Sequence, residues 1–173
     1  MTNNVKRLTL SAFFLALGLI LPIAFHSIGP SGGAFFLPMH IPVLLCGFIC
    51  GPSYGALVGV ITPLLSSAIT GMPVLMPTGI AMMLELMTYG FLSGLLIQKK
   101  NVYVSLLFTM FVGRMVSGLA NLVLLSYLGK AYTLTIFLSA AFVSALPGII
   151  LQILIIPLLL NVVKKIEHKH QVD

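Results

Sequence analysis

The chain has 173 residues, of which 59% are hydrophobic and only 7% are charged. Soluble domains carry about 25% charged residues, and a chain this short cannot hide so much apolar side chain in one core, so an ordinary soluble protein is excluded. The net charge of +6 does not indicate nucleic-acid binding, because the basic residues lie at the ends of apolar segments, where membrane proteins place them.

Six apolar segments predict an all-α integral membrane protein, a six-helix transmembrane bundle that forms one substrate-binding domain over residues 1–173. The first is a retained helix rather than a signal peptide, because it lacks a clear small-x-small cleavage site and more spans follow. The second is shorter than the roughly 20 residues of a full span, so the Gly-rich loop before it is predicted to dip into the protein. The predicted helices cover residues 7–25, 38–50, 53–69, 78–98, 102–127 and 133–163.

The basic residues predict the orientation of the chain. Lys130 alone falls on one side of a six-span protein. The N-terminus, the joint between the fourth and fifth helices and the C-terminus share the other side and carry Lys6, Arg7, Lys99, Lys100, Lys164, Lys165 and Lys169. Because Lys and Arg are enriched in cytoplasmic loops, both termini are predicted to be cytoplasmic and the three longer loops to face outward.

Polar side chains from four predicted helices fall at one depth in the outer half of the membrane. Counted from the predicted cytoplasmic ends at about 1.5 Å per residue, Glu85 and Arg114 reach roughly 20 Å. Gln152 reaches roughly 18 Å and His40 roughly 16 Å. Asn121 follows Arg114 at i+7, which places it on the same helix face. These side chains are predicted to line a wet cleft that opens outward.

Two interpretations of Glu85 and Arg114 stay open. Charges in the bilayer core are rare and generally paired, so the two residues can form an internal ion pair that only locks two helices. Alternatively, the pair both holds the helices and presents hydrogen-bond donors to a ligand. His40 is likewise either a satisfied interior histidine or a ligand-binding group. Met72 flanks an outward loop, where a flexible thioether can line a pocket.

Catalytic, metal-binding and nucleotide-binding motifs do not appear in the sequence. It has no G-x-x-x-x-G-K-[ST] and no H-E-x-x-H, and Cys46 and Cys50 are interpreted as packing residues. Asp173, the only aspartate, lies in the tail, so no Ser-His-Asp set can be assembled. We therefore predict no metal, no cofactor and no enzymatic activity. What remains is a membrane-embedded binding protein or a transporter energised from elsewhere.

A small-residue motif, Ala12-Phe-Phe-Leu-Ala16, stands near the start, and such spacing lets another helix approach closely in lipid. Combined with six spans, cytoplasmic termini and the Gly51-Pro52 joint after a short helix, the chain resembles the substrate-binding S component of energy-coupling factor (ECF) vitamin transporters. The stretch that looks most like the family is LPMHIPVLLCGFICGPSYGALVGVITPLLSSAITGMPVLMPTGIAMMLELMTYGFLSGLL.

The resemblance implies a subunit of an ABC importer in the bacterial plasma membrane. It would capture a water-soluble vitamin from outside and deliver it with a transmembrane coupling subunit and two cytoplasmic ATPases. Ala12 and Ala16 would face the coupling subunit. The pocket would draw on His40, Met72, Glu85, Arg114, Asn121 and Gln152.

Arg114 favours an anionic substrate, because a planar guanidinium matches a carboxylate. Asn121, Gln152 and His40 suit hydroxyl and amide groups, and the absence of tryptophan argues against a large stacking ligand such as a flavin. Among the family's vitamins, pantothenate is therefore favoured. The alternative is hydroxymethylpyrimidine or pyridoxine, which gains if Glu85 fully neutralises Arg114. In another class, the chain would be an intramembrane enzyme or a structural membrane protein that uses this pair.

Overall fold

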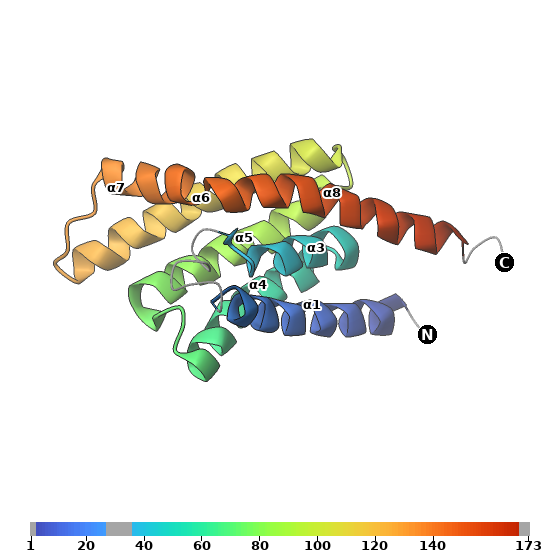
Figure 1. Cartoon of the computed structure of the whole chain (residues 1–173), viewed down its shortest axis with the longest axis horizontal. Helices are drawn as coiled ribbons and strands as arrows, with labels where there is room; N and C mark the ends of the chain where they lie inside the picture. Colours follow the sequence, from blue (N-terminus) through green and yellow to red (C-terminus); the bar gives the residue numbers. More distant parts are fainter. Residues whose placement is uncertain (1–2, 27–35, 170–173) are drawn as a thin grey trace.

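The computed structural model describes residues 3–26 and 36–169. Its helices run roughly along the long axis of the molecule (Figure 1). In the described residues, Leu75–Gly79 before α5 is a kinked turn in which Met76 has extended backbone angles (φ −119°, ψ 129°), and Ser139–Ser144 between α7 and α8 is π-helical. The α-helices are α1 (Asn3–His26), α3 (His40–Cys50), α4 (Pro52–Thr70), α5 (Ile80–Leu96), α6 (Val102–Tyr127), α7 (Leu134–Leu138) and α8 (Leu146–Lys169).

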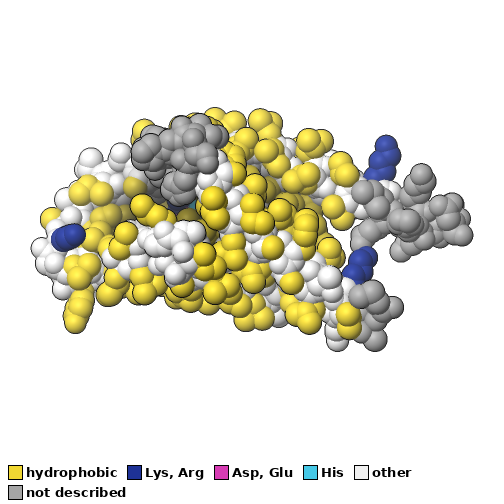
Figure 2. Space-filling view, turned by 60° about the horizontal axis from the view of Figure 1, so that its bottom comes forward, with side chains coloured by type: hydrophobic (Ala, Val, Ile, Leu, Met, Phe, Trp, Pro, Cys, Tyr) yellow, Lys and Arg dark blue, Asp and Glu magenta, His cyan; other side chains and the backbone are white. Residues whose placement is uncertain are grey.

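Among the described residues, five helical stretches are long and apolar enough to cross a membrane. They are Asn4–Phe25, Pro52–Thr70, Leu75–Leu96, Val102–Tyr127 and Leu146–Val163. Helix α3, with 11 residues, is apolar but shorter, as the sequence predicted. Hydrophobic side chains cover the flank of the molecule, while Lys and Arg appear at its two ends (Figure 2). This distribution fits a protein whose sides face lipid and whose ends face water.

The predicted sixth helix over 133–163 is divided, which corrects that prediction. Helix α7 begins after Thr133, whose hydroxyl accepts a hydrogen bond from the backbone N–H of Ile136 at 3.4 Å. The π-helical segment follows, and α8 starts at Leu146, with Pro147 in its first turn. Proline is tolerated there because the first helical N–H groups lack partners inside the helix. The residue before a proline is driven away from helical geometry, which favours a break at this point.

Helix α5 lies in the middle of the bundle, where it packs against α3, α4 and α6. Helix α1 covers α3 and α4, whereas α8 contacts α3 and α6 on the opposite side (Figure 1). The start of α1 and the end of α8 lie at the same end of the molecule (Figure 1). This agrees with termini on a common side, and the assignment of that side to the cytoplasm stays a prediction.

Glycines bring α4 and α5 into backbone contact. A Cβ at Gly90 on α5 would overlap the carbonyl oxygen of Gly55 on α4, and one at Gly59 would overlap the backbone of Leu86. Close backbone approach of this kind drives helix association in lipid, where no hydrophobic force acts between helices. The glycines therefore fix the distance between the helix that carries Glu85 and its neighbour.

We expect Gly90→Ala to lower the thermal unfolding temperature of the purified protein. The added methyl group would force α4 and α5 apart, and overpacking of this kind costs about 1–3 kcal/mol. The matched control is Ala24→Val, which adds apolar bulk at an exposed position of α1. Equal unfolding temperatures for Gly90→Ala and the unaltered chain would contradict the close packing.

Candidate functional site

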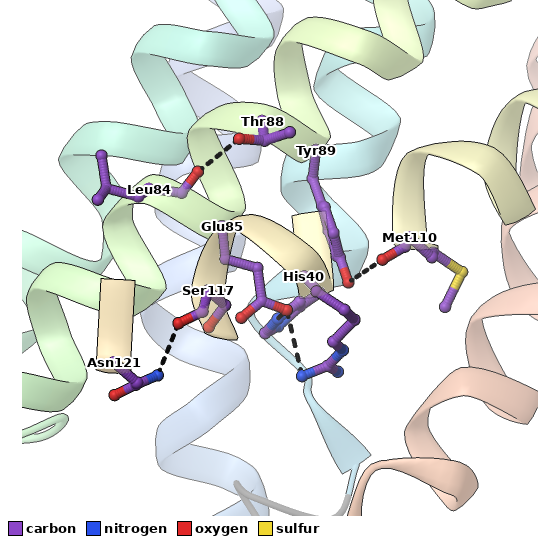
Figure 3. Close-up of polar contacts among 9 residues, drawn as sticks. His40, Leu84, Glu85, Thr88, Tyr89, Met110, Ser117 and Asn121 are labelled. Carbon is purple, nitrogen blue, oxygen red and sulfur yellow. Dashed lines mark hydrogen bonds and ion pairs between the residues drawn. The ribbon is translucent and has the colours of Figure 1, made fainter. Parts of the chain in front are cut away.

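Glu85 is the centre of a buried polar cluster formed by three helices. Its Oε1 forms an ion pair with Nη1 of Arg114 on α6 at 3.1 Å. The same oxygen lies 3.4 Å from Nε2 of His40, the first residue of α3 (Figure 3). The exposed fractions are 4% for Glu85, 8% for Arg114 and 1% for His40. The predicted convergence of these three side chains is thus confirmed.

Tyr89 supports this cluster from the next turn of α5. Its ring lies edge-on to the His40 ring, with 5.4 Å between centroids, and its hydroxyl donates to the carbonyl of Met110 at 3.4 Å (Figure 3). Gly113 makes room for it, because a Cβ there would overlap the tyrosine ring. Tyr89 follows Glu85 by four residues, which places both on one helix face. The sequence signal for its packing is Gly113, the glycine immediately before Arg114.

Arg114 leaves its best hydrogen-bonding edge unused. Nη1 pairs with Glu85 and the Tyr89 side chain lies close to the guanidinium, whereas the buried Nε and Nη2 atoms have no hydrogen bond of good geometry among the residues that the structure describes. The N–H groups of Nε and Nη2 point in parallel and form the fork that holds a carboxylate through two hydrogen bonds. A buried donor without a partner costs about 1–3 kcal/mol. The pair with Glu85 therefore orients a fork that is suited to an external anion.

Gln152 supplies a second set of unpartnered polar atoms from α8. Its side chain is 0% exposed, and within the described part of the chain neither its Nε2 nor its Oε1 has a hydrogen-bond partner. Nδ1 of His40 likewise is buried and has no hydrogen-bond partner among the described residues. Helix α8 packs against α3 and α6, the helices that carry His40 and Arg114. Three neighbouring helices thus carry buried polar atoms that have no hydrogen-bond partner among the described residues.

Within the described part of the chain, Asn121 and Met72 make no hydrogen bond with the three clustered side chains. The half-buried Asn121 donates from Nδ2 to the carbonyl of Ser117 on its own helix at 2.9 Å (Figure 3). Met72 lies in the loop after α4 with 55% of its surface exposed. Its carbonyl accepts hydrogen bonds from the hydroxyls of Ser66 at 2.7 Å and Thr70 at 3.1 Å. The structure therefore brings His40, Glu85 and Arg114 together, and a role of Asn121 and Met72 in binding stays a prediction.

Tyr132, in the loop after α6, lies within electrostatic reach of the cluster. Burial raises the pKa of its phenol, and the carboxylate of Glu85 raises that pKa further. The hydroxyl therefore stays protonated at neutral pH and can donate a hydrogen bond. Nothing in the sequence singles out this residue, because a tyrosine in a short loop carries no periodic signal.

Ala12 and Ala16 lie on the exposed surface of α1, as a partner-facing motif requires. Ile20, one further turn along, is 59% exposed. Positions spaced by four residues line one face of a helix. The small side chains of Ala12 and Ala16 therefore leave room for another helix at two successive turns of this face.

The fold and the cluster define a protein with membrane-length apolar helices and a buried polar cluster. A model of the family "ECF transporter, substrate-specific component" matches residues 6–160, and the chain belongs to this family. Its members are substrate-binding subunits of ECF importers, not enzymes, and they act with an ECF module of a coupling component and ATPases. The resemblance seen in the sequence is thus confirmed at family level. No curated protein and no solved structure matches the chain.

Proposed function

We propose that this subunit captures a small vitamin that carries a carboxylate, with pantothenate as the favoured substrate. It takes the vitamin from outside the membrane and delivers it through its ATPase-driven partners. The observation that carries the proposal is the unused Nε and Nη2 fork of Arg114, held in place by Glu85. A clamp between two helices needs only one edge of the guanidinium, whereas a substrate site needs the other.

Glu85 does not remove the preference for an anion. It occupies one nitrogen of the guanidinium, and a guanidinium has five N–H donors in a rigid arrangement. Arg114 can therefore bridge two carboxylates, one from the protein and one from the ligand. The ion pair then has two roles. It joins α5 to α6, and it holds the Nε and Nη2 edge of Arg114 in the orientation that binds the ligand.

The remaining unpartnered atoms suit the rest of pantothenate, which has an amide and two hydroxyl groups and no aromatic ring. The amide of Gln152 offers a donor and an acceptor, and Nδ1 of His40 offers one further contact. The same amide favours the second candidate, because it could pair with the nitrogen-rich edge of hydroxymethylpyrimidine. A pyrimidine would leave the fork of Arg114 unmatched, so pantothenate ranks first.

A thermal-shift screen of the purified chain tests this function. A ligand that binds only the folded state raises the unfolding temperature. We expect stabilisation by pantothenate and none by pantothenol, its analogue with an alcohol in place of the carboxylate. Equal stabilisation by both compounds would contradict a carboxylate bound to Arg114. If only hydroxymethylpyrimidine or pyridoxine stabilised the protein, that compound would be the substrate instead of pantothenate. The proposed role as a vitamin-binding subunit would be unchanged.

Gln152→Leu separates binding from folding. Leucine fills a similar volume without polar atoms, and removing an unpartnered buried amide lifts its desolvation cost. We expect an unfolding temperature equal to or above that of the unaltered chain, together with at least a tenfold loss of pantothenate affinity, about 1.4 kcal/mol. A marked drop in unfolding temperature would show instead that the amide supports the fold.

The contact with the energising module belongs to the same proposal. Ala12 and Ala16 form the face of α1 against which a helix of the coupling subunit packs, and both termini lie on the cytoplasmic side with the ATPases. The exposure of both alanines supports this arrangement, since small residues at helix interfaces permit close approach in lipid.

A further inference from the structure

A groove lies between the second half of α6 and the segment around α7. Its volume is about 280 Å³, and its lining is formed by Met115, Gly118, Leu119, Leu122, Tyr132, Thr133, Leu134 and Phe137. The ring of Phe137 rests on α6 at Gly118, where a Cβ would overlap it. Phe137 thus forms one wall of the groove, and Gly118 provides its floor.

The groove faces the outside of the bundle. Leu119 is 65% exposed, Leu122 is 45% exposed and Leu134 is 71% exposed. In a protein with membrane-spanning helices, side chains exposed on the flank of a span meet lipid hydrocarbon. An apolar groove of this shape at this place suits an acyl chain, because neither partner loses hydrogen bonds on contact.

Lys130 adds a charge near the groove, in the loop between α6 and α7 and two residues before Tyr132, which lines the groove. It follows the last turn of α6, where its backbone N–H donates to the carbonyl of Leu125 at 2.9 Å, and its side chain is exposed. The sequence holds only three acidic residues, Glu85, Glu167 and Asp173. Glu85 is paired with Arg114, and the other two lie in the last seven residues of the sequence. The exposed charge of Lys130 can therefore attract an anion from outside the protein.

We propose that this groove binds one acyl chain of an anionic phospholipid, whose phosphate contacts the ammonium group of Lys130. The hydrocarbon wall and the cation are joined by Tyr132 and Thr133, which line the groove two and three residues after Lys130. Tyrosines are enriched at the level of the lipid headgroups, which fits Tyr132 at the boundary between the two parts. This inference depends on the membrane location of the chain and not on the identity of its vitamin.

Photo-crosslinking in vesicles tests the site. The full chain is reconstituted in phosphatidylcholine that contains phosphatidylglycerol with a photoactivatable acyl chain, and the labelled peptides are identified by mass spectrometry. We expect at least threefold more label between Met115 and Phe137 than on the exposed face of α4 around Leu57, Ile61 and Leu65. An even distribution of label over all exposed helices would overturn the proposal.

Two variants and a competition resolve the parts of the site. Leu122→Trp should fill the groove and reduce the label there at least threefold, whereas Leu107→Trp, on the same helix but outside the groove, should not.

Lys130→Ala should reduce labelling by the phosphatidylglycerol probe but not by a phosphatidylcholine probe, and Lys99→Ala at the opposite end should change neither. Equal labelling by both probes in the unaltered chain would contradict the proposed preference for an anionic headgroup. Loss of label on adding pantothenate would assign the groove to the vitamin instead.

Discussion

Arg114→Ala is expected to lower pantothenate affinity by at least tenfold, about 1.4 kcal/mol, and to destabilise the fold. Binding falls because the variant lacks the fork that would hold the carboxylate. Stability falls because Glu85, 4% exposed, is left without the guanidinium that binds its Oε1 at 3.1 Å. Removing one partner of a buried ion pair costs about 3–5 kcal/mol. Calorimetric titration and thermal unfolding in the same detergent measure the two effects.

The double variant Glu85→Gln with Arg114→Met distinguishes a clamp from a binding site. Replacing both charges of a buried pair by neutral groups of similar size is often neutral or stabilising. We therefore expect the double variant to recover the unfolding temperature lost in Arg114→Ala but not the affinity for pantothenate. If affinity returned together with stability, the pair would be a structural clamp and the vitamin would bind elsewhere. Unchanged affinity in a folded Arg114→Ala protein would likewise remove Arg114 from the site.

Depth counting along the sequence predicted the centre of the site because membrane helices are regular and begin at charged boundaries. Glu85 and Arg114 lie on antiparallel neighbours at equal counted depth, and the structure joins them. The place of Asn121 in the site, which the same method predicted, stays a prediction. Asn121 shares a helix face with Arg114 but lies seven residues further on, which is about 10 Å along the axis. At that height its amide binds the carbonyl of Ser117.

Other features depend on contacts that have no periodic signal in one sequence. The long apolar runs gave α4 and α6 nearly to the residue, since 53–69 and 102–127 were predicted and Pro52–Thr70 and Val102–Tyr127 are found. The division of 133–163 was hidden because both halves are equally apolar. The position of the loop around Met72 could not be predicted by counting residues along helices, because a loop has no regular rise per residue. Which nitrogen of Arg114 stays free could be learned only from atomic geometry.

Ala12→Trp is expected to abolish uptake while vitamin binding by the isolated subunit stays unchanged. Ala12 is exposed on α1, so an indole there should be accommodated in the free protein. In the assembled transporter it would stand between α1 and the coupling subunit, where only small residues permit close approach. Uptake by vesicles that contain the complete transporter should fall at least tenfold, and Ala16→Trp should act in the same way. Thermal shift with pantothenate measures binding in parallel.

The matched control is Leu107→Trp, which places the same indole on α6. Leu107 is 53% exposed and follows Lys100 by seven residues, much as Ala12 follows Lys6 by six, so the two substitutions lie at similar counted depth. Helices α1 and α6 lie on opposite sides of α5 (Figure 1). If both variants lost uptake equally, the defect would come from bulk in the membrane rather than from a partner on α1. Full uptake by Ala12→Trp would show that the coupling subunit binds another face of the protein, because a close helix contact has no room for an indole at its centre.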